Sequence, residues 1–302
     1  MEGCFEYFTG LLDMGVDYVT LANPLLIDFV LKHFPDLKVV ISVCANTDSL
    51  QKVEYWEDRG VHGIVLSKRL NKDFGSLEQI ANNSSVKLQV IANDLCIPDC
   101  PLNTYHNLVS SFGSRSAHDG SCYPHQSYAT LSCRLVMLLD PSAIIRGPMI
   151  RPEDVHHYVD VGINVFKLVD RTSPTNFLQL VMDAYGSASY DGNFADLCSF
   201  FVQQKVEEPD FSGPRIIKED ELNNLASLER LKNHLRFTPY IDNKTLDGQI
   251  DFVKKNDCTR RSCSKCGFCN KLAHKAVTID SQVKKIVEGN IRRAIDLLIS
   301  GR

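Results

Sequence analysis

Gly15-Val-Asp-Tyr-Val-Thr-Leu21 decides the fold of this chain, because versions of the same phrase recur further along. The others are Gly60-Val-His-Gly-Ile-Val-Leu66 and Gly162-Ile-Asn-Val-Phe-Lys-Leu168. Each joins a glycine and a β-branched residue to an apolar run ending in leucine, and each follows a helix-like segment. Glycine commonly ends a helix, and a short apolar run after it is typical of a buried strand. The phrase therefore predicts three strands, each entered from a helix.

Further strands and helices fill the intervals between these phrases. The other predicted strands are Lys38–Val43, Lys87–Ala92 and, with a weaker pattern, Ala143–Arg146. The predicted helices are Pro24–Phe34, Ser49–Arg59, Phe74–Ala81, Pro152–Val161 and Pro174–Tyr185. Strands that alternate with helices indicate parallel βαβ units. Because no glycine-rich nucleotide-binding pattern follows any strand, an α/β fold of TIM-barrel type is favoured over a doubly wound sheet.

The alternation is lost from about Gly186 onward. A linker-like stretch at 207–214 precedes a charged helical segment near 219–235, and Ile291, Ile295 and Leu298 mark one apolar helix face. The predicted domains are a (β/α) barrel at 1–185, with a long loop at 94–135, and an irregular or helical extension at 186–302 that carries a cysteine-rich motif.

Composition and charge restrict the function classes. The 302 residues are 44% hydrophobic and 23% charged, which is ordinary for a globular protein. No stretch approaches the roughly 20 apolar residues that span a bilayer, and the N-terminus has no secretory signal pattern. The cysteine count is odd, so a reducing, cytoplasmic location is expected. Residues 251–302 carry an excess of basic residues but lack the interleaved aromatics of a nucleic-acid stacking surface, so RNA binding has weak support.

Eight of the eleven cysteines fall into two groups of four. The compact group is a C-x4-C-x2-C-x2-C run, formed by Cys258, Cys263, Cys266 and Cys269. The wider group lies in the 94–135 loop and comprises Cys96, Cys100, Cys122 and Cys133. Closely spaced thiolates can converge on zinc or on an iron–sulfur cluster, and the compact run fits either. For the wider group, free buried thiols are the alternative, and His106, His118 or His125 could replace a cysteine as ligand.

Polar residues follow the predicted strands, where barrel enzymes place their chemistry. They include Asn23, Asn46, Ser67, Lys68, Arg69, Asn93 and Arg146. Lys167, Asp170 and Arg171 after the last strand form the predicted catalytic set, and Asn93 and Arg146 are the predicted cofactor-binding residues. In a barrel these basic and amide groups would ring one face, which suits an anionic or carbonyl-rich ligand. The alternative is that strand ends are polar simply because they are exposed.

Several phrases together resemble the peptidase U32 (collagenase-like) family. They are 12–24, 35–46, 60–67, the strand entering Asn93-Asp-Leu-Cys96, and 162–171 followed by Ser173-Pro-Thr175. The resemblance covers about 11–195. It implies a TIM-like barrel with a cysteine-held 4Fe–4S cluster near the loop that carries the wider group, although the usual cysteine spacing of the family differs from this one.

The resemblance implies two kinds of activity. Some members are proteases, and others resemble oxygen-independent hydroxylation factors for RNA bases or ubiquinone precursors, with the anion prephenate as oxygen source. The leading prediction is an iron–sulfur enzyme that hydroxylates or otherwise tailors a small molecule, peptide or RNA. It carries one or two 4Fe–4S clusters, with zinc as the alternative at the compact run. The alternatives are a U32-type peptidase, which lacks a visible nucleophile here, and a non-catalytic, zinc-stapled scaffold or partner subunit.

Family members are similar in having about three further βα units before the stretch that corresponds to Gly15. Only 1–14 precede that glycine here, which is enough for one helix. The resemblance therefore predicts a barrel that is incomplete at its N-terminus, either a truncated product or a partial barrel completed by a partner subunit.

Overall fold

The computed structural model describes residues 2–113, 123–169, 173–201, 212–223, 225–256, 258 and 261–300. The chain divides into two compact units, and each is assembled from separate segments. Unit 1 comprises Met1–Ala92, Met149–Leu168 and Ile250–Arg261, and unit 2 comprises Asn93–Pro148, Val169–Gln249 and Ser262–Arg302. This division differs from a boundary at residue 185, which stays a prediction.

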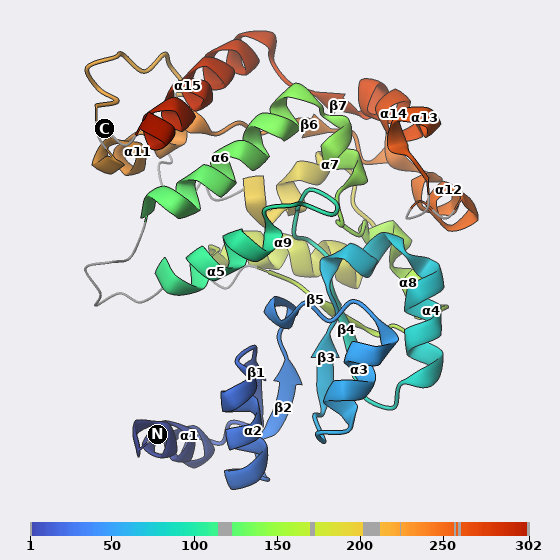
Figure 1. Ribbon diagram of the computed structural model, residues 1–302. Helices are drawn as coiled ribbons and strands as arrows, with labels where there is room; N and C mark the ends of the chain where they lie inside the picture. Colours follow the sequence, from blue (N-terminus) through green and yellow to red (C-terminus); the bar gives the residue numbers. More distant parts are fainter. Residues whose placement is uncertain are drawn as a thin grey trace. The chain divides into compact units, whose positions relative to one another are not determined.

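Unit 1 is built on a five-stranded parallel sheet (Figure 1). Its strands lie in chain order and comprise β1 (Tyr18–Leu21), β2 (Lys38–Ile41), β3 (Gly63–Val65), β4 (Lys87–Ile91) and β5 (Val165–Lys167). Inner strands are almost wholly apolar, and Val39, Ile64 and Val90 are inaccessible to solvent. Such continuous apolar runs are expected where helices cover both faces of a parallel sheet. The predicted α/β fold is confirmed, while closure of this sheet into a barrel stays a prediction.

The helices of unit 1 alternate with the strands as predicted. They are α1 (Glu2–Asp13), α2 (Pro24–His33), α3 (Leu50–Glu57), α4 (Phe74–Asn83), α8 (Val155–Val159) and most of α12 (Gln249–Asn256). Asn23 begins α2, because its side-chain oxygen accepts hydrogen bonds from the N–H groups of Leu25 and Leu26. The strand-end residue Asn23 is therefore a helix cap.

The recurrent glycines act as the sequence predicts. Gly15, Gly60 and Gly162 have φ values of 78°, 80° and 92°, in the left-handed region that other residues seldom adopt. Each donates its N–H to a carbonyl three residues earlier in the preceding helix segment, at 2.8–2.9 Å. The chain therefore leaves each helix at a fixed point and enters the next strand three residues after the glycine.

Unit 2 is mainly helical. Its longer elements are α5 (Asn103–Gly113), α6 (Tyr123–Leu139), α9 (Thr175–Gly186), α14 (Phe268–Ala276) and α15 (Ser281–Ser300), and α15 packs against α6 (Figure 1). Smaller elements are α7 (Ser142–Arg146), α11 (Leu225–Arg230), α13 (Cys263–Cys266) and the antiparallel pair β6 (Tyr240–Ile241) and β7 (Val277–Thr278). The buried Asn290 amide of α15 accepts from the Ile217 N–H and donates to the Arg215 and His234 carbonyls.

Three predictions about local structure need correction. The segment 143–146 is helix α7 rather than a strand, because the Asp140 side chain accepts from the Ser142 N–H and hydroxyl and so starts a helical turn. The described parts of 94–135 are largely helical, in α5 and α6. Segment 219–235 contains α11 and a 3₁₀ turn at Lys232–Leu235 rather than one helix. No helix in the described ranges is long and apolar enough to cross a membrane.

Unit 1 also buries an ionic group. Asp154 lies in the 3₁₀ turn Pro152–Asp154 before α8 and is only 8% exposed, and the Arg151 Nη1 is 3.8 Å from its Oδ1. Burial raises the pKa of Asp154 to about 6, against the opposing effect of the Arg151 and Lys72 charges. The Asp154 carboxyl therefore changes its ionisation state near pH 6 rather than near pH 4.

Replacement of Gly162 by alanine is expected to destabilise unit 1. The added Cβ would lie 3.1 Å from the Ala81 Cβ, in a backbone region that costs about 1–2 kcal/mol for a non-glycine residue. We expect Gly162→Ala to lower the free energy of urea unfolding by at least that amount. Gly186→Ala is the control, because no atom lies within 4 Å of its added Cβ and its φ is not positive. Equal stability of the two variants would contradict this account.

The pKa of Asp154 predicts a pH-dependent stability. A carboxyl whose pKa is raised on folding, here from 3.8 to about 6, stabilises the folded state while it is protonated. That contribution is complete below about pH 4 and is lost as the pH rises through 6, a change of about 3 kcal/mol. Asp154→Asn should remove this decline from unfolding curves measured at pH 4 to 7. The exposed Asp36→Asn serves as control and should leave the decline in place.

Candidate functional site

Polar groups meet at the carboxyl ends of β2 and β3. Asn46 adopts a left-handed conformation (φ 51°), and its Oδ1 accepts a hydrogen bond from the Ser67 hydroxyl at 2.8 Å. The Ser67 N–H donates to the Thr47 carbonyl at 2.8 Å. Thr47 is fully buried, and its hydroxyl has no hydrogen-bond partner among the described residues. Two residues predicted to follow neighbouring strands, Asn46 and Ser67, are therefore in direct contact.

Charged side chains surround this contact. The Lys52 ammonium is 2.7 Å from Asp48 Oδ1 and donates to the Asn46 carbonyl at 3.0 Å, while Arg69 Nε is 3.6 Å from Asp48 Oδ2. Lys52 and Arg69 are both substantially exposed, with 48% and 40% of their side chains accessible. Two cations and one carboxylate thus present a net positive edge to solvent, which favours an anionic ligand.

The ends of β4 and β5 are joined by backbone contacts. The Ala92 N–H donates to the Lys167 carbonyl, and the Ala92 carbonyl accepts from the Ile150 N–H. The next residue, Arg151, is 3% exposed, and it pairs with Asp154 as described above. Sequence reasoning missed both residues, since only their burial marks them. Buried ionisable groups with a shifted pKa near strand ends are typical of functional sites, although structural ion pairs have the same signature.

The predicted catalytic set is only partly described. Lys167 ends β5, where its side chain is half-exposed. Asp170 and Arg171 lie outside the described residues. The roles assigned to all three residues stay predictions.

The two residues predicted to bind a cofactor have protein partners. The buried Asn93 amide accepts from the Val169 N–H at 2.7 Å and donates to the carbonyls of Val169 and Leu197. Arg146 lies on α7, and its Nη2 is 2.8 Å from Asp140 Oδ2. The Asn93 side chain therefore links two other segments of unit 2 by hydrogen bonds. The ligand-binding roles of Asn93 and Arg146 stay predictions.

Cys133 of the wider group lies within electrostatic range of Cys96 and of Cys100 in unit 2. Burial, followed by the neighbouring Cys96 and Cys100 thiols, raises the pKa of Cys133 to about 12. The Arg134 charge and the Ile97 N–H oppose this rise. Helix α6 carries Cys133, whereas Cys96 and Cys100 come from the segment after β4, so the fold gathers residues that lie over thirty positions apart.

This donor set suits a cation. A thiol whose ionisation is disfavoured, as that of Cys133 is, becomes a good ligand once a metal supplies positive charge. Across the described ranges no three His, Cys, Asp or Glu side chains are already grouped as a metal site. Cys122, His118 and the side chain of His125 lie outside the described residues.

The compact cysteine run occupies the start of the last helical segment. Cys263 and Cys266 are the first and last residues of α13, and Cys269 lies in the first turn of α14. Cys263 is exposed, and Cys258, Cys266 and Cys269 are half-buried. None of these four described cysteines is in a disulfide.

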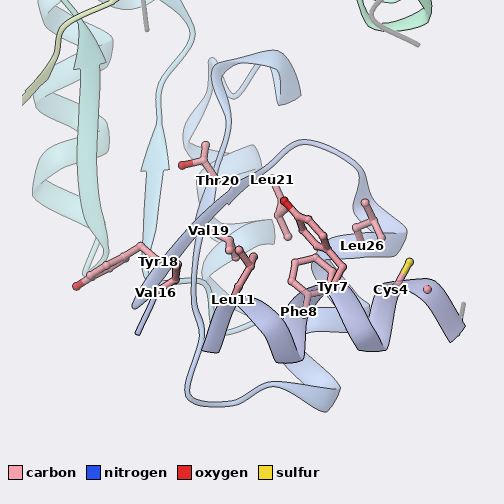
Figure 2. A pocket seen from close by; sticks show the side chains of 11 residues that line it. Cys4, Tyr7, Phe8, Leu11, Val16, Tyr18, Val19, Thr20, Leu21 and Leu26 are labelled. Carbon is pink, nitrogen blue, oxygen red and sulfur yellow. The ribbon is translucent and has the colours of Figure 1, made fainter. Parts of the chain in front are cut away.

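Unit 1 also has a hydrophobic pocket of about 570 Å³ (Figure 2). Side chains from α1, β1 and the start of α2 line it, among them Tyr7, Phe8, Leu11, Val19 and Leu26. None of its lining residues is charged. The pocket therefore suits an apolar group and does not suit the anion expected at the strand ends.

Comparisons with known proteins identify relatives of this chain. A protein named uncharacterized protease MJ1657, from Methanocaldococcus jannaschii, is 29% identical over 272 residues, which cover 90% of this chain and 70% of that protein. The tRNA hydroxylation protein P of Escherichia coli is 27% identical over 230 residues, covering 73% of this chain and 43% of that protein.

The solved U32 peptidase Mk0906 aligns with a TM-score of 0.40 and 20% identity, over 57% of this chain and 63% of that one. The match to the E. coli relative spans less than half the length of that protein. A sequence profile described as peptidase family U32 matches residues 1–193, well over half of the chain. The protein therefore belongs to peptidase family U32.

Proposed function

We propose that this protein is an iron–sulfur enzyme that hydroxylates a base in RNA without using dioxygen. The observation that carries the proposal is the gathering of Cys96, Cys100 and Cys133, which supplies thiol ligands for a cluster. The name of the E. coli relative, a tRNA hydroxylation protein, supports hydroxylation as the reaction and tRNA as the substrate.

A 4Fe–4S cluster would be held by these three thiolates, with Cys122 as the fourth ligand, and it would supply electron-transfer chemistry. The protein must stabilise the thiolate form of Cys133, whose pKa is about 12 without a metal. The Arg134 guanidinium is suited to this task, because its charge favours the thiolate and the residue is only 8% exposed. Arg134 would therefore help to hold the ligand set in its anionic form.

The cationic groups at the strand ends would bind an anionic organic co-substrate. Conversion of a C–H bond to C–OH is a two-electron oxidation, so the co-substrate must give up an oxygen and accept two electrons. Lys167 and Arg171 are the residues proposed to hold its carboxylate, and Asp170 is proposed to orient them. The buried Arg151 and Asp154 would stabilise the segment that pairs with the end of β4 through the Ile150 N–H.

A peptidase is the second candidate function, because the M. jannaschii relative is named a protease. A peptidase of this chain would need an activated nucleophile or a metal-bound water. Peptide cleavage that survives replacement of Cys96, Cys100 and Cys133 by serine would favour this candidate over the hydroxylase.

Complementation tests the proposed function. When this chain is expressed in E. coli that lacks its own tRNA hydroxylation protein P, hydroxylated nucleosides should reappear in digested tRNA, detected by mass spectrometry. The Cys96→Ser, Cys100→Ser, Cys133→Ser variant should abolish the product, because the cluster cannot be held. The exposed Cys44→Ser is the matched control and should retain it. A folded, soluble protein that yields no hydroxylated nucleoside would overturn the proposal.

Lys167 should affect the reaction without affecting the cluster. We expect Lys167→Ala to reduce hydroxylated product about 100-fold, because a lost charge contact to a bound anion removes stabilisation realised at the reacting centre. Lys87→Ala, at the opposite end of neighbouring β4, is the control and should have no effect. Iron content and visible spectrum should match the wild type in both variants. Equal activity of the two variants would remove Lys167 from the proposed site.

A further inference from the structure

The compact cysteine run is not explained by the proposed function. It lies outside the 1–193 region that matches the family profile, and its last three cysteines, Cys263, Cys266 and Cys269, belong to a helical segment of unit 2. We infer that Cys263, Cys266 and Cys269 bind a metal centre of their own, a 4Fe–4S cluster separate from the one proposed at Cys96. Their C-x2-C-x2-C spacing is the one by which bacterial ferredoxins hold three corners of such a cluster.

The backbone of the run is arranged for convergent ligands. Cys263 and Cys266 are three residues apart on one helical turn, so their side chains lie on one face of α13. The Gly267 N–H donates to the Cys263 carbonyl at 2.9 Å, and the left-handed Gly267 (φ 65°) then reverses the chain into α14. No atom lies within 4 Å of the Cβ that a side chain at Gly267 would add, so backbone conformation rather than space requires the glycine. Cys269 then follows in the first turn of α14, two residues after this reversal.

Local charge also favours thiolates. Arg261, Lys265, Lys271 and Lys275 flank the three cysteines within the run and α14, and all four are exposed. Nearby cations lower the free energy of a thiolate relative to the thiol, and they offset the negative charge that a thiolate-bound cluster retains. The excess of basic residues in this part of the chain would therefore stabilise the thiolate form of the three cysteines.

The thiols do not form a closed site among the described residues, where Cys263 is exposed to solvent. Metal binding must draw the exposed thiol toward its neighbours, which is the usual coupling of a metal site to local order. The exposure of Cys263 makes the inference testable. Because burial does not shield this thiol from reagents, slow labelling of Cys263 would indicate that it is bound to a metal.

Thiol labelling of the wild-type chain tests the inference. The protein is purified anaerobically, treated with iodoacetamide, digested, and examined by mass spectrometry. Cys44 is the internal control, because it too is an exposed free thiol. We expect Cys263 to react at least about tenfold more slowly than Cys44. After the metal is removed with ferricyanide and EDTA and the thiols are reduced, both should react at similar rates.

Metal content distinguishes this centre from the one proposed at Cys96. The Cys263→Ser, Cys266→Ser, Cys269→Ser variant should lose about four iron and four sulfide per chain. The Cys96→Ser, Cys100→Ser, Cys133→Ser variant should keep Cys263 protected, whether or not RNA hydroxylation is the activity. Equal labelling of Cys263 and Cys44 in the metal-loaded protein would overturn the inference. Protection of Cys263 in protein that contains zinc but no iron would also overturn it.

Discussion

The left-handed glycine at the end of a helix is the constraint on which unit 1 depends. At Gly15, Gly60 and Gly162 the chain leaves a helix at a residue that tolerates positive φ, and the next strand begins within a few positions. The start of each strand sets its register against its neighbour, as in the pairing of Val19 with Val39. Because all five strands are parallel, their carboxyl ends lie at one edge of the sheet. The polar residues that follow β2, β3, β4 and β5 therefore begin at that same edge.

That edge brings together groups that are distant in the sequence. Asn46 and Ser67 meet across two strand ends, and Ala92 joins the end of β4 both to Lys167 and to the segment that carries Arg151. The cysteines of unit 2 are gathered differently, by a helix that returns Cys133 to the segment of Cys96 and Cys100. In unit 1 these polar residues come from segments that follow strands, whereas in unit 2 a helix supplies Cys133.

Much of this could be predicted from the sequence, because the strands and helices of unit 1 have strong local signals. The prediction of a strand at 143–146 is wrong because a short apolar run is compatible with strand and helix, and the local turn in which Asp140 accepts from Ser142 decides between them. The irregular spacing of Cys96, Cys100 and Cys133 gave their grouping weak support, and the family resemblance strengthened it. Arg151 and Asp154 could not be anticipated, because their importance comes from burial that depends on tertiary packing.

The Asn93 side chain has a mechanical consequence. Its amide ties the segment that leads to Cys96 to the backbone of Val169 and Leu197, with contacts in both directions to Val169. One side chain therefore holds together the backbone that leads to Cys96 and the backbone that precedes Asp170, both within unit 2.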